Sequence, residues 1–140
     1  MSVDATPSSQ TIYSALFYRD ALAAIAWLKE VLGFEERLVV PGPESSVAHA
    51  ELSFEGAVIM LGTSQQDRGW KSPLDLAGIN QLTYLVAEDV DSLYQRVQAA
   101  GAEIAIELQE MEYGSREFTV RDPEGHFWSI GTYRPGGVGS

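Results

Sequence analysis

The sequence contains two segments of the same design, and this internal repeat constrains the fold more than any other feature. In each segment a short apolar run leads to an acidic residue and a helix-like stretch that ends at glycine, at residues 20–33 and 89–101. Each segment then closes with two strand-like runs joined through Glu-Gly, at residues 55–56 and 124–125. A repeat of this size indicates a duplicated supersecondary unit that packs against its copy. A site between the two halves is then the natural place for function.

Both repeats predict the same order of elements. Asp20 and Asp89 are suited to cap helices that glycines terminate. Alternating and apolar runs predict the strands, at residues 11–18, 34–40, 46–54, 57–63, 81–87 and 103–108, with a hairpin from 116 to 133. The chain is therefore expected to be an α+β protein of two tandem βαβββ modules, at about 11–63 and 80–134, within a single domain. A polar linker at 64–80 is either a crossover or a functional loop.

Composition excludes several classes of protein. The chain has 140 residues, of which 45% are hydrophobic, enough for one domain with a core. It has no cysteine, which excludes disulfides, thiolate metal sites and thiol nucleophiles. No run is long and apolar enough to span a membrane, and the start lacks the pattern of a signal peptide, so we expect a cytoplasmic protein with no membrane partner.

The charge balance argues against one class of partner and leaves two interpretations of the surface. The formal net charge is −11, and no cluster of basic residues is present to contact phosphates, so no nucleic-acid partner is expected. The acidic surface either keeps the protein soluble or attracts a cationic ligand.

The order of these elements resembles that of the vicinal oxygen chelate superfamily. The resemblance is carried by the paired βαβββ order, the helix end at residues 31–34, and the run around Asp-Pro-Glu-Gly at 120–126. It covers about residues 11–133 and is strongest for the glyoxalase/bleomycin-resistance-like proteins. It implies the glyoxalase/bleomycin-resistance fold and, because such proteins commonly dimerise, a homodimer.

The same resemblance implies four positions for metal ligands, and the residues found there are poor ligands. Metal enzymes of the family place His or Glu at one position on each of four strands, and this chain has Tyr13, Glu51, Gln81 and Ser129 there. One strong ligand of four does not hold a catalytic divalent ion. The resemblance therefore predicts no glyoxalase-type metal centre and no cofactor.

Strand periodicity predicts which side chains share the inward face of the sheets. His49 and Glu51 are two residues apart, so they look into the same space. They are open to three interpretations: a structural pair, an acid/base or ligand-polarising pair, or part of a metal site. The other residues predicted to line the site are Tyr13, Phe17, Gln81, Thr83, Glu117, Phe127 and Ser129. The loop aromatics Trp70 and Tyr113 either stack on a ligand at its mouth or pack over the edge of the sheet.

The same alternation assigns the remaining strand residues. Leu85 is placed with Thr83 on the inward face, whereas Leu82, Tyr84 and Val86 are placed against the helices. His126, just after the turn glycine, is interpreted as a solvated residue of the hairpin.

Two functions follow from these residues. In the first, the protein binds a small molecule without a metal, for instance a cationic aromatic antibiotic, as bleomycin-resistance-like proteins do. In the second, it is a small-molecule lyase, isomerase or hydrolase that uses His49 and Glu51 as an acid/base pair.

Overall fold

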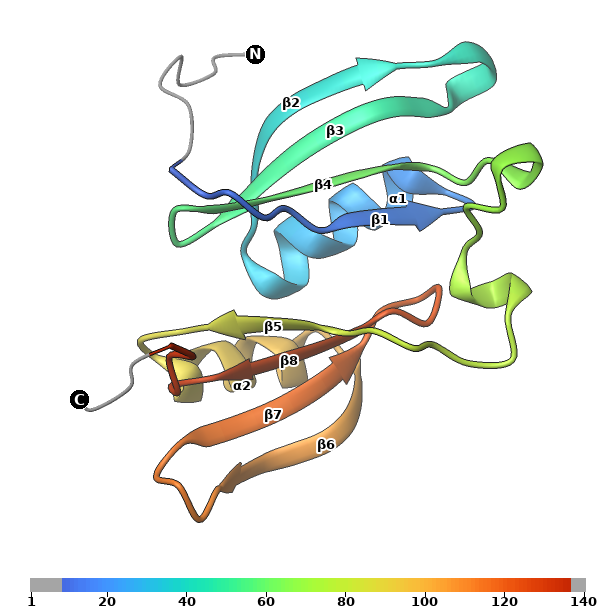
Figure 1. Cartoon of the computed structure of the whole chain (residues 1–140). Coiled ribbons are helices and arrows are strands. Elements are labelled where there is room, and N and C mark those ends of the chain that lie inside the picture. The colour runs from blue at the N-terminus through green and yellow to red at the C-terminus, as the bar shows by residue number, and fades with distance from the viewer. Residues whose placement is uncertain (1–8, 137–140) are drawn as a thin grey trace.

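The computed structural model describes residues 9–136, which form two four-stranded sheets of identical topology (Figure 1). The first sheet has the order β1 (Ala15–Tyr18), β4 (Ala57–Thr63), β3 (Val47–Phe54), β2 (Glu35–Pro41). The second has the order β5 (Thr83–Val86), β8 (Phe127–Gly131), β7 (Arg116–Arg121), β6 (Glu103–Glu110). In each sheet the first strand runs parallel to the last, and the other pairs are antiparallel. The predicted tandem βαβββ, α+β fold is confirmed; the strands β1–β4 and β5–β8 with their helices are called the first and second modules below.

Each module has one α-helix, capped by the aspartate that the sequence indicates. The helix α1 (Ala21–Trp27) begins where the side chain of Asp20 accepts the backbone N–H of Ala23, at 3.0 Å. It continues as a π-helical turn (Leu28–Leu32) that ends at Gly33, whose φ of 81° lies in the left-handed region. The helix α2 (Val90–Ala99) begins in the same way at Asp89. Among the described residues, none of the helices has the length and apolar character needed to cross a membrane.

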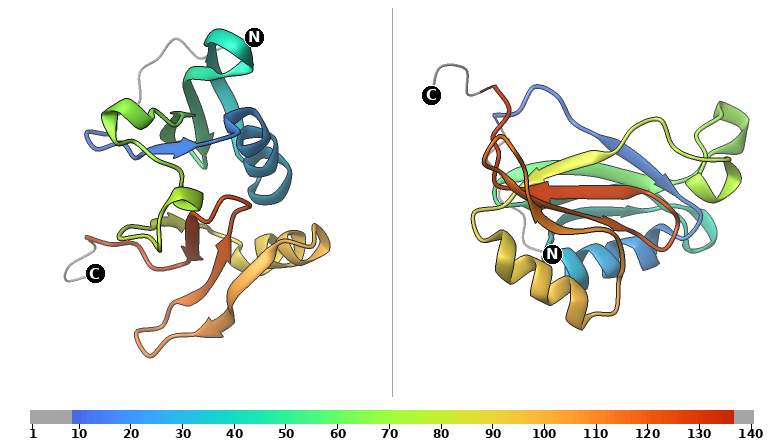
Figure 2. Two further views of the ribbon diagram at one scale, coloured as in Figure 1. Left: turned by 90° about the vertical axis from the view of Figure 1, so that its right-hand side faces the viewer. Right: turned by 90° about the horizontal axis from the view of Figure 1, so that it is seen from below.

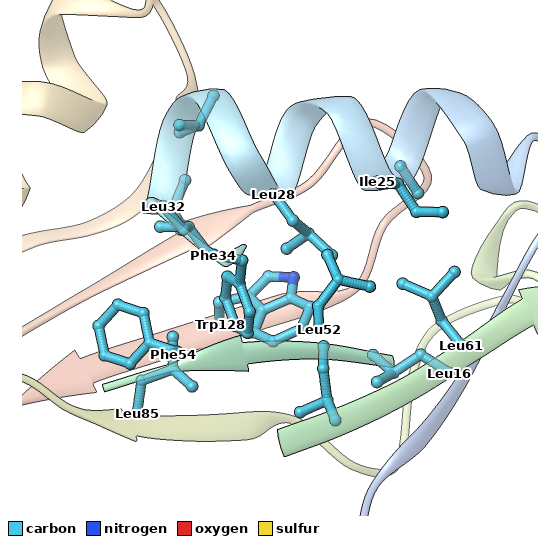
Figure 3. Packing of buried hydrophobic residues seen from close by; sticks show 14 of the residues in the cluster. Leu16, Ile25, Leu28, Leu32, Phe34, Leu52, Phe54, Leu61, Leu85 and Trp128 are labelled. Carbon is cyan, nitrogen blue, oxygen red and sulfur yellow. The ribbon is translucent and has the colours of Figure 1, made fainter. Parts of the chain in front are cut away.

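The helix-facing sides of both sheets pack into one core. Phe34 lies at its centre, with its ring centroid 5.4 Å from that of Phe54 and 5.6 Å from that of Trp128 on the other sheet. Figure 3 shows Trp128 of the second module near Leu28 and Leu52 of the first, and Leu85 beside Phe54. Because the two sheets share this core, the opposite faces of the two sheets lie on the outside of the molecule (Figure 2). We call them the first and second outer faces.

A buried carboxylate at the β7–β8 turn joins the modules. Asp122 is 3% exposed, and its Oδ2 accepts the hydroxyl of Tyr18 at 2.7 Å and the indole N–H of Trp128 at 3.1 Å. Its Oδ1 accepts the backbone N–H groups of Glu124 and His126, both at 3.0 Å. A buried charge that accepts four hydrogen bonds is well compensated, so this turn fixes the relative position of β1 and β8.

His126 is not the solvated hairpin residue that the sequence suggests. Its Nε2 lies 3.0 Å from the backbone oxygen of Phe17, and its ring packs 4.7 Å from that of Tyr18. The prediction was wrong because both contacts come from residues more than a hundred positions away, which the local turn pattern does not indicate.

The strand β5 also differs from prediction, in the direction of its side chains. Thr83 pairs with Trp128 and Leu85 with Ile130, and paired residues point to the same side of a sheet. Trp128 and Ile130 are buried in the core, so Thr83 and Leu85 point toward it, whereas Tyr84 and Val86 point to the second outer face. Apolar residues occur at both odd and even positions of this strand, so alternation alone does not determine which of its faces points toward the core.

The predicted first strands were also too long. Both β1 and β5 start only where parallel pairing with the last strand of their sheet begins, at Ala15 and Thr83. The predicted linker contains two short helical turns, Gln66–Arg68 and Pro73–Asp75.

Candidate functional site

The first outer face has an imidazole–carboxylate pair at its centre. Nε2 of His49 lies 2.8 Å from Oε2 of Glu51, and the two side chains are 40% and 36% exposed. Val40 and Leu38 of β2 lie beside them in the sheet, and Met60 of β4 lies on the other side of Glu51. The pair is therefore a polar centre in an apolar, solvent-accessible surface, where a carboxylate orients the ring.

The second outer face has hydroxyl groups and a second carboxylate. The hydroxyls of Thr119 and Ser129 are paired at 2.8 Å on neighbouring strands. Glu117, two residues before Thr119, lies on the same face and accepts the hydroxyl of Tyr113 at 2.7 Å. This hydrogen bond raises the pKa of Tyr113 to about 12, because it stabilises the protonated phenol next to a negative charge.

Within one chain the two groups of polar residues lie on separate sheets. His49 and Glu51 lie on the side of the first sheet away from the shared core, and Glu117 and Ser129 lie on the side of the second sheet away from it. Figure 2 shows both helices on the same side of the two sheets, so both outer faces lie on the opposite side of the molecule, and the residues predicted to share one face form two groups on separate sheets.

The separation of the two outer faces also separates the positions at which related metal enzymes hold their ion. Glu51 and Ser129 lie on different outer faces, and Gln81 lies just before β5 with its side chain exposed. Within residues 9–136, no three His, Cys, Asp or Glu side chains gather closely enough to hold a metal ion. One carboxylate among a phenol, an amide and a hydroxyl is a poor ligand set for a catalytic divalent ion.

A groove between the modules brings together four of the residues predicted from sequence. It has a volume of about 610 Å³ and lies between β1, the linker and the start of β5. Phe17, Gln81, Thr83 and Phe127 line it together with Lys71. The groove is open to solvent and separate from His49, Glu51, Glu117 and Ser129.

The loop residue Trp70 packs against the wall of this groove. Its ring is stacked on that of Phe17, with centroids 5.0 Å apart and planes at 27°, and the guanidinium of Arg68 lies 4.9 Å above it. Trp70 remains 41% exposed, so both the packing and the stacking interpretation of this residue stay open. Tyr13 is half-buried ahead of β1 and does not line the groove.

Two tyrosines of the second outer face were missed by sequence reasoning. The sequence predicts Tyr84 on the helix side and Tyr133 at the end of the hairpin. Tyr84 donates its hydroxyl to the backbone oxygen of Tyr133 at 2.8 Å, and the rings of Tyr133 and Tyr113 are 5.5 Å apart at 73°. The signal that could have found Tyr84 is its position opposite Ser129 in the β5–β8 ladder, which requires the register.

The fold, the repeat and the position of the Asp-Pro-Glu-Gly turn define a two-module protein of the glyoxalase type. The chain belongs to the Glyoxalase/Bleomycin resistance protein/Dioxygenase superfamily, whose family model matches residues 11–130.

Particular proteins of similar sequence and structure are found in bacteria. The chain is 36% identical over 115 residues to the uncharacterized protein Rv0887c of Mycobacterium tuberculosis, covering 80% of this chain and 68% of that protein. The crystal structure of TioX from Micromonospora sp. ML1 matches with a TM-score of 0.70 and 30% identity, over 90% of this chain and all of that one (100%). FosX of Listeria monocytogenes, a fosfomycin resistance protein, matches with a TM-score of 0.68 at 16% identity, over 91% of this chain and 95% of that one, which shows a common fold.

Proposed function

We propose that the protein binds a small organic molecule without a metal ion, in a site formed between two copies of the chain. The first outer face of one protomer meets the second outer face of its partner, so that a symmetric homodimer contains two such sites. The observation that carries this proposal is the division of the polar residues: His49 and Glu51 lie on one outer face, and Glu117 and Ser129 lie on the other.

The exposure of both faces supports a partner at this surface. The first outer face includes Val40, which is 40% exposed, beside the His49–Glu51 pair. The second includes Ile106, which is 50% exposed and pairs with Thr119. Apolar strand residues next to polar groups are typical of surfaces that bind a ligand or a partner.

The charge of the site favours a cationic ligand with an aromatic part. A composite site of this kind contains two carboxylates, Glu51 and Glu117, and the whole chain has a formal net charge of −11. A cationic aromatic antibiotic has the chemistry that such a site would bind, and the name of the superfamily includes bleomycin resistance proteins.

An enzymatic function is the second candidate, and one observation favours it. The 2.8 Å contact between His49 and Glu51 is the geometry of an imidazole held by a carboxylate, which is the arrangement of a general base. A lyase, isomerase or hydrolase would use the ring nitrogen that does not face Glu51 to move a proton of the substrate.

The first experiment measures the assembly and its contents together. Light scattering at micromolar concentration is expected to give a mass of about twice the chain's 15.3 kDa. Native mass spectrometry of the same sample is expected to show no stoichiometric zinc, nickel, manganese or iron. A monomer, or one equivalent of metal that is lost in Glu51→Gln, would contradict the proposal.

The second experiment separates binding from catalysis. Proflavine, a planar cationic aromatic, is titrated against the protein while its fluorescence is followed. Loss of the Glu51 charge in Glu51→Gln is expected to weaken binding roughly tenfold, since a charge pair near 4 Å is worth about 1–4 kcal/mol at intermediate to high dielectric. Glu30→Gln is the matched control, because Glu30 is exposed on the helical side of the same module. Conversion of a bound ligand that stops in both Glu51→Gln and His49→Gln would favour the enzyme.

A further inference from the structure

Three tyrosines surround one carboxylate on the second outer face. Tyr84 comes from β5, Tyr113 from the β6–β7 turn, and Tyr133 from the segment after β8, and Glu117 of β7 lies among them. We call these four residues the tyrosine cluster. The hydroxyl of Tyr113 donates to Oε2 of Glu117 at 2.7 Å, and the hydroxyl of Tyr84 donates to the backbone oxygen of Tyr133 at 2.8 Å. The rings of Tyr113 and Tyr133 meet edge to face at 5.5 Å.

A glycine makes room for this arrangement. A Cβ atom at Gly131 would lie 2.5 Å from Cγ of Glu117 and 2.6 Å from the hydroxyl oxygen of Tyr84. Both side chains therefore cross directly over the backbone of β8, and any larger residue at position 131 would displace them. The cluster thus depends on a residue without a side chain at this position.

Glu117 is not neutralised by a basic side chain of the described part of the chain. The neighbouring Arg116 points away, and its guanidinium pairs with Asp91 at 2.7 Å and with Glu110 at 3.4 Å. Only Oε2 of Glu117 has a hydrogen bond within residues 9–136, from Tyr113, so Oε1 is available to a ligand. The aromatic surface beside it is accessible, since Tyr113 is 58% and Tyr133 47% exposed.

We propose that the tyrosine cluster binds an organic ammonium group. A positive charge is attracted both to the faces of aromatic rings and to a carboxylate, and the cluster presents these side by side. The methyl or methylene groups around an ammonium nitrogen also pack on tyrosine rings, which a hydrated metal ion does not do. The assigned ligand class rests on the proposed function and narrows it, because it names the group of the small molecule that the second module recognises.

Other ions fit this cluster less well. A divalent metal needs several anionic or strongly donating oxygens, and here one carboxylate stands among phenols, with the pKa of Tyr113 raised to about 12. A phosphate or carboxylate ligand would be repelled by Glu117. An organic cation is the class whose charge, size and apolar surface match all four residues.

The test compares choline with its uncharged isostere, 3,3-dimethylbutan-1-ol, by NMR titration of the full-length protein. Choline is expected to shift the signals of residues around Glu117 with about tenfold higher affinity than the isostere, which equals about 1.4 kcal/mol, from combined cation–π and carboxylate attraction. Equal affinities of the two compounds, or shifts at a different part of the molecule, would overturn the proposal.

Variants separate the contributions of the carboxylate and of the aromatic rings to the affinity for choline. Glu117→Gln is expected to lose most of the preference for choline, whereas Glu112→Gln, which removes an exposed carboxylate five residues earlier, is expected to keep it. Tyr113→Phe retains the ring and frees Glu117 from its hydrogen bond, so choline affinity should be kept, while Tyr113→Leu should reduce it severalfold. Equal choline affinity in all four variants would contradict the assignment.

The outcome is distinguishable from a failure of the composite dimer site. The four residues belong to one chain, so choline binding is expected whether the protein is a monomer or a dimer. A monomeric mass with normal choline binding would reject the shared site and retain the tyrosine cluster. A dimer in which choline and its isostere bind equally would reject the cluster and retain the shared site.

Discussion

The carboxylate of Glu124 accepts the backbone N–H of Asp20 at 2.8 Å and so joins residues 104 positions apart. Its other oxygen accepts the backbone N–H of Arg19 at 2.6 Å and the hydroxyl of Ser72 at 2.6 Å. Glu124 is only 8% exposed. One carboxylate of the second module thus holds the start of α1 and the linker, next to the turn at which Asp122 holds β1.

Replacing this carboxylate tests whether it holds the modules together. Glu124→Gln keeps the shape but exchanges one acceptor oxygen for an NH₂ group, which then faces a donor in a buried place. We expect the free energy of unfolding to fall by about 1–3 kcal/mol, the usual cost of an unsatisfied buried polar group. Urea denaturation measures it. Glu107→Gln, at an exposed position of β6, should change stability by no more than about 0.5 kcal/mol, and equal effects in the two variants would show that Glu124 has no special role.

The Tyr18–Asp122 hydrogen bond gives a second prediction. Burial and the neighbouring Asp122 raise the pKa of Tyr18 well above its usual value, so the phenol stays protonated and donates to the carboxylate. Tyr18→Phe removes one of the four donors of a buried charge and should destabilise the protein by about 1–3 kcal/mol.

Tyr94→Phe is the matched control for Tyr18→Phe. It deletes the same hydroxyl from a tyrosine that packs edge-on against Phe118, with ring centroids 5.0 Å apart. No hydrogen bond of the Tyr94 hydroxyl occurs in the described part of the chain, so its loss should cost less. A larger loss of stability in Tyr94→Phe than in Tyr18→Phe would contradict the importance of the buried network.

The sequence predicts the elements well because their signals are local. The aspartate caps, the terminating Gly33 and the turn at Asp122 act within a few residues. The aspartate cap also occurs in both repeats, so each repeat supports the prediction for the other. Strand alternation also placed His49 with Glu51 correctly on one face. These features depend on neighbours in the chain, so a single sequence contains the information.

Features that depend on distant contacts were not predictable in this way. The role of His126 requires Phe17, and the direction of Tyr84 requires the pairing of β5 with β8. The division of the predicted site into two outer faces follows from the two separate sheets, whose helix sides share the core at the contact of Phe34 with Trp128. Periodicity states which residues share a face but not where that face points.

A third prediction concerns the titration of Tyr113. Its pKa is raised to about 12 chiefly by the hydrogen bond to Glu117, so Glu117→Gln should lower it toward 10, the ordinary value for tyrosine. Because the folded-state pKa is the higher one, this hydrogen bond contributes stability below about pH 10, and the contribution is lost as the pH rises through about 12.

NMR titration of tyrosine Cζ carbons measures this pKa directly. Tyr94 in the same spectrum serves as an internal comparison, because its neighbours are unchanged by the substitution at position 117. A Tyr113 pKa that stays near 12 in Glu117→Gln would mean that the carboxylate is not its cause.

The last prediction concerns the contact between the two helices. The guanidinium of Arg96 on α2 donates to the backbone oxygens of Lys29 and Glu30, both at 3.0 Å, where the helix of the first module ends. These carbonyls have no partner further along their helix, and a positive charge there is also attracted to the negative end of the helix dipole. Arg96→Met keeps much of the apolar stem and removes both donors, so we expect a loss of about 1 kcal/mol, part of it screened by salt. Urea denaturation at low and high salt measures both contributions, with Arg134→Met, at an exposed position beyond β8, as the control. Equal stability of Arg96→Met and Arg134→Met at low salt would show that water replaces the guanidinium without cost and that the shared core alone holds the helices together.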